Sequence, residues 1–308
     1  DGYVGKPPSA GTDVFAMDTQ IANGYPMYIS NFVVDYALHR DPTYSGTWEG
    51  DWFSVSRLQG PDTLIINGTG TEQSGTWQHW DYNNGFGENG STSYTDWQAW
   101  MWKRHAGFDV VTYDGNGSAR QISHSLSKAP EMIWIKCRDN TFNWKVYHKG
   151  ANGGTNPEQY YFRLNHSDAE ATSSTMWNNT APTSTVFTVG SAGGVNNNNN
   201  DFIAMLFASV DGICKVGTYD GSNSTQTITC GFQPRFFFQK RITGAGEWHT
   251  CDTLRGWGAG GDKFMYFDGN AAQGTYDFGA PTATGFTLTG GAPTVSGAGE
   301  NYIYYAHA

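Results

Sequence analysis

Apolar and polar residues alternate along most of the chain in short runs, and glycine, asparagine and aspartate bound these runs. Residues 160–164, 186–189 and 215–218 are three examples, each rich in aromatic or β-branched side chains. A period of two places successive side chains on opposite faces of a β-strand. No segment shows a 3.6-residue apolar period with helix caps, so the pattern predicts an all-β protein built from antiparallel strands.

The alternating runs recur as a repeat of about 100 residues. The tripeptide Tyr-Asp-Gly occurs at 113–115 and again at 219–221, and each time an alternating run, a proline and an apolar strand with a basic end follow it. A strand that begins with tryptophan comes next, at Trp144 and at Trp248. Self-similarity over this length indicates that one structural unit is used more than once.

A weaker first copy precedes these two. Its tryptophan strand, at Trp52, aligns without a gap with the one at Trp248, but the Tyr-Asp-Gly start is missing. The sequence therefore predicts three copies: residues 1–107 with an N-terminal lead-in, 108–211 and 212–308. About seven strands in each 100 residues are typical of an antiparallel sandwich. The predicted fold is three tandem jelly-roll or lectin-like β-sandwiches, with the tryptophan of each copy at an equivalent position.

The strand that closes the second copy, residues 202–207, is apolar on both faces. Its side chains point alternately to the two sides of the sheet, so one set covers the core of its own sandwich. The other set would form an exposed apolar patch unless a neighbouring copy or a second subunit covers it. We therefore expect a homo-oligomer, most simply a trimer or a larger ring or filament, with packing between copies as the alternative.

Charge and length exclude two classes of partner. The chain has 18 Lys and Arg against 28 Asp and Glu, a formal net charge of −10, and its basic residues do not cluster. Nucleic-acid binding needs a basic face, so we expect no nucleic acid partner. No apolar run approaches the roughly 18 residues that a membrane-spanning helix needs, so we expect no membrane insertion.

The four cysteines are too dispersed for a disulfide scaffold, and none has the C-x-x-C spacing of a zinc site. Cys214 and Cys230 lie symmetrically about Ser222, which we place at the tip of a hairpin. They either face each other at disulfide distance or serve as small core residues.

Residues that could carry catalysis do not recur in the copies. Glu49 with Asp51, and Asp168 with Glu170, have the spacing that puts two glycosidase carboxylates on one strand face, but each pair lies beside turn residues. The histidines are expected to be solvated strand residues, and His148, the best placed, has no counterpart in the other copies. Nucleophile and phosphate-binding motifs are absent from the sequence, so we expect no enzyme, no cofactor and no metal.

The first copy holds seven of the 12 tryptophans. Trp77 and Trp80 lie in a stretch rich in Gly, Asn, Gln and His, with Tyr82 just beyond, and rings beside polar side chains can stack on a sugar. Core packing is the alternative for all seven, because large rings are usually buried. Trp77, Trp80 and Tyr82 form the candidate glycan-binding platform.

Several segments resemble a known repeat. Residues 130–138, which follow the first Tyr-Asp-Gly and its strand, resemble a repeat of large marine bacteriophage proteins that are often described as tail-fibre-like or lectin-like. Residues 207–221 are similar to the join between successive copies of that repeat, and so is the stretch 232–248 with its Lys-Arg and Glu-Trp pairs. The resemblance covers residues 108–308 well and 13–107 loosely.

This resemblance implies a virion structural or fibre protein with concanavalin-like sandwiches, and it implies no catalytic or binding residues. We therefore expect a non-enzymatic phage virion component, a tail or capsid fibre or decoration protein at the particle surface. Its expected partners are other virion subunits and host-surface glycans. The alternative from a different class is a carbohydrate-binding module or a polysaccharide depolymerase.

Overall fold

The structure, a computed structural model, describes residues 5–21, 24–75, 78–88, 96–258, 260–290 and 295–308. Their regular secondary structure is almost entirely antiparallel β-sheet, which confirms the predicted all-β sandwich fold. The helices found in them are single turns: η1 (Gly11–Asp13), η2 (Ala151–Gly154), η3 (Pro157–Gln159) and α1 (Gly193–Asn196). We call residues 1–107, 108–211 and 212–308 copy 1, copy 2 and copy 3.

Each copy contributes one main sheet, and the strand orders of the three main sheets correspond. In copy 1 the order is β1 (Phe15–Thr19), β8 (Gln98–Trp102), β3 (Tyr36–Arg40), β4 (Phe53–Ser56), β5 (Leu64–Ile65). In copy 2 it is β9 (Phe108–Asp114), β16 (Asp201–Phe207), β11 (Met132–Cys137), β12 (Lys145–His148), β13 (Tyr160–Arg163), β14 (Ala171–Thr172). In copy 3 it is β17 (Cys214–Asp220), β25 (Asn301–His307), β19 (Phe236–Arg241), β20 (His249–Asp252), β21 (Asp262–Tyr266), β22 (Gly274–Tyr276).

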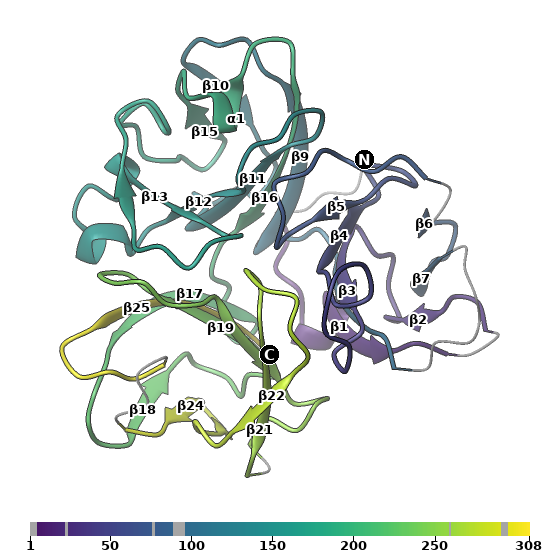
Figure 1. Cartoon of the computed structure of the whole chain (residues 1–308), viewed down its shortest axis with the longest axis vertical. Coiled ribbons are helices and arrows are strands. Elements are labelled where there is room, and N and C mark those ends of the chain that lie inside the picture. Colours follow the sequence, from purple (N-terminus) through teal and green to yellow (C-terminus); the bar gives the residue numbers. More distant parts are fainter. Residues whose placement is uncertain (1–4, 22–23, 76–77, 89–95, 259, 291–294) are drawn as a thin grey trace.

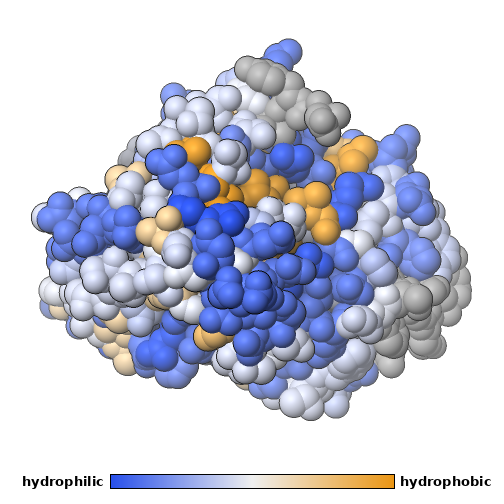
Figure 2. Space-filling view, turned by 90° about the horizontal axis from the view of Figure 1, so that it is seen from above, coloured by the Kyte–Doolittle hydropathy of each residue, from blue (hydrophilic) through white to orange (hydrophobic). Residues whose placement is uncertain are grey.

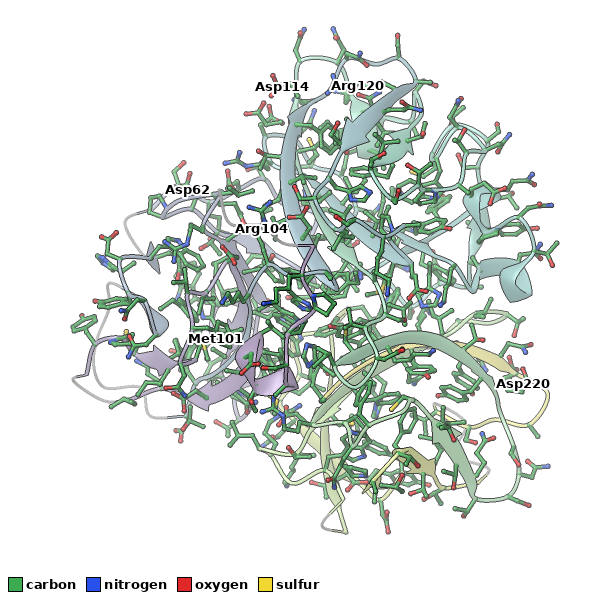
Figure 3. All side chains as sticks on the ribbon, turned by 180° about the vertical axis from the view of Figure 1, so that it is seen from behind. Asp62, Met101, Arg104, Asp114, Arg120 and Asp220 are labelled. Carbon is green, nitrogen blue, oxygen red and sulfur yellow. The ribbon has the colours of Figure 1, made fainter. Side chains whose placement is uncertain are left out.

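A small second sheet covers one face of each main sheet. These sheets are β2 (Tyr28–Ile29), β7 (Gly85–Glu88), β6 (Gln78–His79) in copy 1; β10 (Arg120–Ser123), β15 (Val186–Val189) in copy 2; and β18 (Gln226–Thr229), β24 (Gly285–Leu288), β23 (Pro281–Thr282) in copy 3. The chain thus crosses from the main sheet to the small sheet directly after the first strand of each copy. Asp114 and Asp220, which end β9 and β17, lie at the periphery of the molecule (Figure 3).

The predicted hairpin around Ser222 is wrong, because β17 and β18 belong to different layers. β17 pairs with β25 and β18 pairs with β24. Cys214 therefore packs in the core at the centre of the molecule, whereas Cys230 packs in the outer core of copy 3. All four cysteines are free and buried, so the disulfide alternative fails and the interpretation as small core residues holds.

The central strands of every main sheet are buried on both faces. In copy 2, Ile133 and Leu206 pack with Phe187 of the small sheet, whereas Trp134 and Met205 point the other way. This second set joins the inner faces of the other two main sheets in one central core to which all three copies contribute. Figure 1 shows the three sandwiches grouped around this centre. The second apolar face of the closing strands is therefore covered within the chain, which accounts for the pattern without a second subunit.

The three tryptophans that precede β4, β12 and β20 occupy equivalent positions and link the copies in a ring. Each side chain is fully buried, and each indole donates a hydrogen bond to a backbone carbonyl of a different copy. The bonds are Trp52 Nε1 to Tyr266 O at 2.7 Å, Trp144 Nε1 to Ile65 O at 2.9 Å and Trp248 Nε1 to Arg163 O at 2.8 Å. Copy 1 thus contacts copy 3, copy 2 contacts copy 1 and copy 3 contacts copy 2, so the ring closes.

A buried cation near the end of β3, β11 and β19 repeats the same circular pattern. Arg40, Lys136 and Lys240 are fully buried at equivalent register positions. Their contacts across the copies are Arg40 Nη2 to Ala271 O at 2.8 Å, Lys136 Nζ to Thr69 O at 3.3 Å and Lys240 Nζ to Ser167 O at 2.7 Å. Burial lowers the pKa of Lys136 and of Lys240 to about 8. These cations satisfy loop carbonyls that would otherwise be buried without a partner.

Candidate functional site

The structure removes Trp80 from the predicted glycan-binding platform of Trp77, Trp80 and Tyr82. Trp80 is only 8% exposed; its indole donates to Gly60 O at 2.6 Å and its ring stacks on Phe86. The Arg57 guanidinium also lies 5.6 Å from the Trp80 ring centroid. Trp80 is therefore a core residue of copy 1 and cannot present its ring to a sugar, while Trp77 lies outside the described residues.

Tyr82 is the platform residue that retains some exposure. Its ring stacks with that of Tyr25 at a centroid distance of 6.4 Å, and Tyr25 is 55% exposed. No sequence pattern predicts this contact, because Tyr25 precedes β2 and Tyr82 lies more than 50 residues later, between β6 and β7.

The most exposed indole in the described part of the chain belongs to Trp48. It lies in the loop that joins β3 to β4, together with Tyr44; the two side chains are 49% and 43% exposed. Trp48 has a backbone φ of 76°, a left-handed conformation that bulky residues rarely adopt. Such strain persists only where the surroundings hold it, and it clusters at functional positions.

Hydrogen bonds fix the shape of this loop. Asp51 Oδ2 accepts from Trp48 N at 2.8 Å, and Asp41 N donates to Glu49 O at 3.0 Å, which closes the loop on itself. The Trp48 ring meets Phe53 edge-on, with centroids 5.5 Å apart and planes at 83°. One edge of the indole is thereby anchored, so the loop presents a ring whose position is preset.

The same loop lies against copy 3. Gly46 N donates to Asn270 O at 3.1 Å, and Gln273 N donates to Pro42 O at 2.7 Å. The turn that carries Asn270 and Gln273 also lines a mostly apolar pocket of about 190 Å³ between β21 and β22, whose walls include Phe264, Tyr266 and Ala272. We call residues 41–51 with this turn the aromatic loop surface; it is built at the junction of copies 1 and 3.

A second depression lies on copy 2 and is polar. Its volume is about 490 Å³, and amide and hydroxyl side chains line it: Gln159, Thr172, Ser173, Ser174 and Asn179. It is open to solvent and has no exposed aromatic side chain among its lining residues. Sugar sites combine stacking rings with polar groups, so the aromatic loop surface is the better candidate.

Three of the four acids in the carboxylate pairs, Asp51, Asp168 and Glu170, are held in structural contacts. Asp51 accepts hydrogen bonds from Trp48 N, from Asn67 Nδ2 at 2.7 Å and from Asn270 Nδ2 at 3.3 Å. Asp168 binds Arg163 and also His166, whose Nδ1 is 2.8 Å from Asp168 Oδ1. Glu170 Oε2 accepts from Asn152 N at 2.7 Å, and burial raises the pKa of the Glu170 carboxyl.

The expectation that the histidines are solvated is wrong for five of the eight. His39, His105, His148, His249 and His307 are each at most 3% exposed. Burial lowers the pKa of His105, His148 and His249 to about 3, so these imidazoles are neutral at physiological pH. In His148, Nδ1 accepts from Gly150 N at 2.9 Å, which makes this residue part of the interior between copies 2 and 3.

The described residues contain neither a cluster of metal-binding side chains nor a membrane-spanning helix. The described part of the chain holds no group of three or more His, Cys, Asp or Glu side chains placed to bind a metal ion. Within it, no helix combines the length and apolar character needed to cross a bilayer. Figure 2 shows a face of the molecule on which hydrophilic residues dominate and hydrophobic residues gather in one band.

These features define an all-β sandwich-repeat protein with an aromatic loop surface. Residues 49–308 match the model of a family described as a domain of unknown function, DUF7483. The match spans most of the chain, so the chain belongs to this family. It covers copies 2 and 3 whole and copy 1 from the loop before β4 onward. No curated protein matches the chain.

Proposed function

We propose that the chain is a non-enzymatic structural component of a phage virion, a fibre, knob or decoration subunit at the particle surface. The ring of three sandwiches around one core supports this proposal. Each copy is tied to the next by a buried indole and a buried cation, and a unit closed in this way resists local opening. The resemblance of residues 108–308 to tail-fibre-like phage repeats supplies the setting, with other virion subunits as partners.

Immunogold labelling tests this function. An antibody raised against the purified chain is expected to decorate intact particles from the virus that encodes it, at a defined place such as the tail or the capsid surface. Mass spectrometry of gradient-purified particles should detect the chain at a fixed ratio to the major capsid protein. A chain that is abundant in infected cells but absent from purified particles would refute the proposal.

We further propose that the aromatic loop surface contacts host-surface glycans. The observation that favours it is the half-exposed Trp48 indole, held on a left-handed backbone and edge-packed against Phe53. A preset ring can stack on the apolar face of a pyranose without the loss of freedom that a mobile side chain would suffer. Thr43 and Thr47 are exposed on the same loop, and their hydroxyls can bond sugar hydroxyls.

Two double variants separate this surface from the platform predicted by the sequence. Tyr44→Ala with Trp48→Ala removes two exposed rings of the aromatic loop surface, and Tyr25→Ala with Tyr82→Ala removes a matched pair of rings elsewhere on copy 1. On a glycan array or on host cells, the first variant should lose binding at least tenfold and the second should bind as the parent does. Loss of binding by the second variant alone would place the site at Tyr82. If both variants bind as strongly as the parent, stacking at either place is excluded.

The rival function, a polysaccharide depolymerase, is distinguished by product release. Such an enzyme would liberate reducing ends from host polysaccharide, and Glu49→Gln or Glu170→Gln would abolish the release. The structural contacts of Asp51, Asp168 and Glu170 favour the non-enzymatic function. We expect no reducing ends above background from the parent protein.

A further inference from the structure

A pair of polar side chains recurs beside the central tryptophan of each copy. One member directly precedes the tryptophan, and the other accepts a hydrogen bond from the tryptophan backbone N–H. The acceptors are Asn67 Oδ1 at 2.9 Å, Asn165 Oδ1 at 3.1 Å and Asp268 Oδ1 at 2.9 Å. The three pairs are thus Asp51–Asn67, Asn143–Asn165 and Glu247–Asp268.

In copies 1 and 2 an amide group joins the two members of the pair. Asn67 Nδ2 donates to Asp51 Oδ1 at 2.7 Å, and Asn165 Nδ2 donates to Asn143 Oδ1 at 2.9 Å. An amide carries its donor protons at every pH. These two bonds are therefore independent of pH near neutrality.

In copy 3 both members are carboxylic acids, and their side chains are hydrogen-bonded to each other. Two carboxylates have acceptors only, so this bond exists only while one of them holds a proton. Burial, together with the hydrogen bond and the charge of Glu247, raises the pKa of the Asp268 carboxyl to about 7. The same repeat position thus carries an amide in two copies and a titrating group in the third.

Charged groups of both neighbouring copies face this pair. The Lys240 ammonium is attracted to both acids, but its hydrogen bonds go to the carbonyls of Ser167 and Gly246. The other ionisable groups at this place are Tyr266 and Arg241 of copy 3 and, from copy 2, Asp168, Arg163 and His166. Arg163 is bound to Asp168 and Arg241 to Glu300, so Lys240 is the cation that opposes a second negative charge.

The pair lies at the junction between copies 2 and 3. Asp268 holds the backbone of Trp248, and the Trp248 indole donates to Arg163 O of copy 2 at 2.8 Å. Lys240 crosses the same junction to Ser167 O at 2.7 Å. Loss of the shared proton would leave two adjacent carboxylates, Glu247 and Asp268, that repel each other beside the Trp248 and Lys240 contacts with copy 2.

We propose that the Glu247–Asp268 pair is a proton-sharing latch that holds copy 3 to copy 2 in mild acid and loosens this one junction as the pH rises through neutrality. The other two junctions carry amide pairs and do not respond. A rise in pH through neutrality would then weaken the junction of copies 2 and 3 and leave the other two junctions unchanged. The latch does not depend on the virion function proposed above.

Thermal unfolding of three full-length proteins tests the latch: the parent, Asp268→Asn and Glu247→Gln. Asp268→Asn rebuilds the carboxylate–amide pair that copy 1 already has, and both substitutions remove the shared proton. The folded parent holds a proton that the unfolded chain releases above about pH 4, so the parent loses stability relative to either variant as the pH rises from 4 to 7.

Between pH 5 and pH 7 the unfolding equilibrium constant of the parent should rise about 50-fold relative to Asp268→Asn, because the folded chain keeps one proton up to its pKa of about 7 and the unfolded chain has lost it above about pH 4. Because the buried histidines are common to all three proteins, their contribution cancels in the difference between melting temperatures. Melting temperatures of parent and both variants that stay parallel from pH 5 to pH 8.5 would overturn the proposal, since Lys240 would then stabilise two ionised acids.

A second measurement locates the effect. Hydrogen exchange followed by mass spectrometry, corrected for the intrinsic pH dependence of exchange, should show that residues 160–168 become less protected at pH 8 than at pH 6 in the parent only. Residues 64–69, at the amide-paired junction of copies 1 and 2, serve as the internal control. The matching transplant, Asn67→Asp, puts an acid pair beside Trp52, whose indole donates to Tyr266 O of copy 3, so the protection of residues 262–266 should then fall with pH. Equal changes at residues 160–168 and 64–69 of the parent would contradict a local latch.

Discussion

The central core makes a specific prediction about cooperativity, which the substitution Trp144→Ala tests. The Trp144 side chain is fully buried in the core that all three copies share, and its indole donates to Ile65 O of copy 1. Removing it leaves a cavity at the centre and a buried carbonyl without its donor. The damage is therefore done to the contact between copies as well as to copy 2.

The expected cost is about 3–5 kcal/mol, the usual range when a buried tryptophan is truncated to alanine. Loss of the hydrogen bond is included in that range, because the indole nitrogen leaves with the ring; an unpaired buried carbonyl by itself costs about 1–3 kcal/mol. Stabilities of single domains are about 5–15 kcal/mol, so the substitution removes a large share of the total.

Urea unfolding followed by circular dichroism measures this cost. With a slope of about 3 kcal/mol/M, the midpoint should fall by about 1–1.7 M. Since the core is shared, the chain should still unfold in one transition that has moved as a whole. Trp52→Ala and Trp248→Ala should shift the midpoint by similar amounts, because the two residues hold the equivalent positions in copies 1 and 3.

Tyr276→Ala is the control, since this side chain is 50% exposed and surface substitutions usually change stability by no more than about 0.5 kcal/mol. The reasoning would be refuted by two transitions in Trp144→Ala, one of them at the midpoint of the parent. That result would mean that copies 1 and 3 remain folded without copy 2 and that the central core does not couple them.

Three further outcomes are expected. The four buried cysteines should not react with a thiol reagent in the native protein, because burial raises the pKa of Cys214 to about 12 and shields all four; stoichiometric labelling before unfolding would contradict this. Acid should destabilise the protein. Burial lowers the pKa values of His105, His148 and His249 to about 3 in the folded chain. Below about pH 6.5 these histidines therefore bind protons in the unfolded chain but not in the folded chain. These histidines contribute a loss of up to about 4 kcal/mol per pH unit, measurable by urea unfolding at pH 6 and pH 4.5, and equal stability at the two pH values would exclude it. Lys240→Met should cost about 2–3 kcal/mol, because two carbonyls at the junction of copies 2 and 3 lose their donor; an unchanged urea midpoint would show that water replaces the ammonium.

Local patterns were sufficient to predict the class of fold and the strands. Alternation of apolar and polar residues is a property of neighbouring residues, so it reports strands such as Val186–Val189 directly. The same local pattern does not show which strands pair with each other. A turn between two strands predicts a hairpin, but the chain leaves the main sheet after β17 and enters the small sheet at β18, so Cys214 and Cys230 lie in different cores.

The candidate site shows the same division. Trp80 and Trp48 are both tryptophans among polar neighbours, and the sequence favoured Trp80. The Trp80 ring is buried because it packs on Phe86 and its indole donates to Gly60 O. The Trp48 ring is half exposed because its loop projects it into solvent. A signal for Trp48 did exist, since glycines at 46 and 50 bracket it in a turn between two strands. Its left-handed backbone could not be inferred from that alone.

The repeat, the strand content and the apolar side chains on both faces of the main strands can all be predicted from the sequence. What covers the second face depends on tertiary contacts. The covering side chains belong to the other two copies, and each tryptophan indole finds its acceptor in a different copy, about 80 residues away for Trp144 and Trp248 and more than 200 for Trp52. Contacts over such separations depend on how the sheets close around the centre, because burying all three apolar faces at once requires a closed ring.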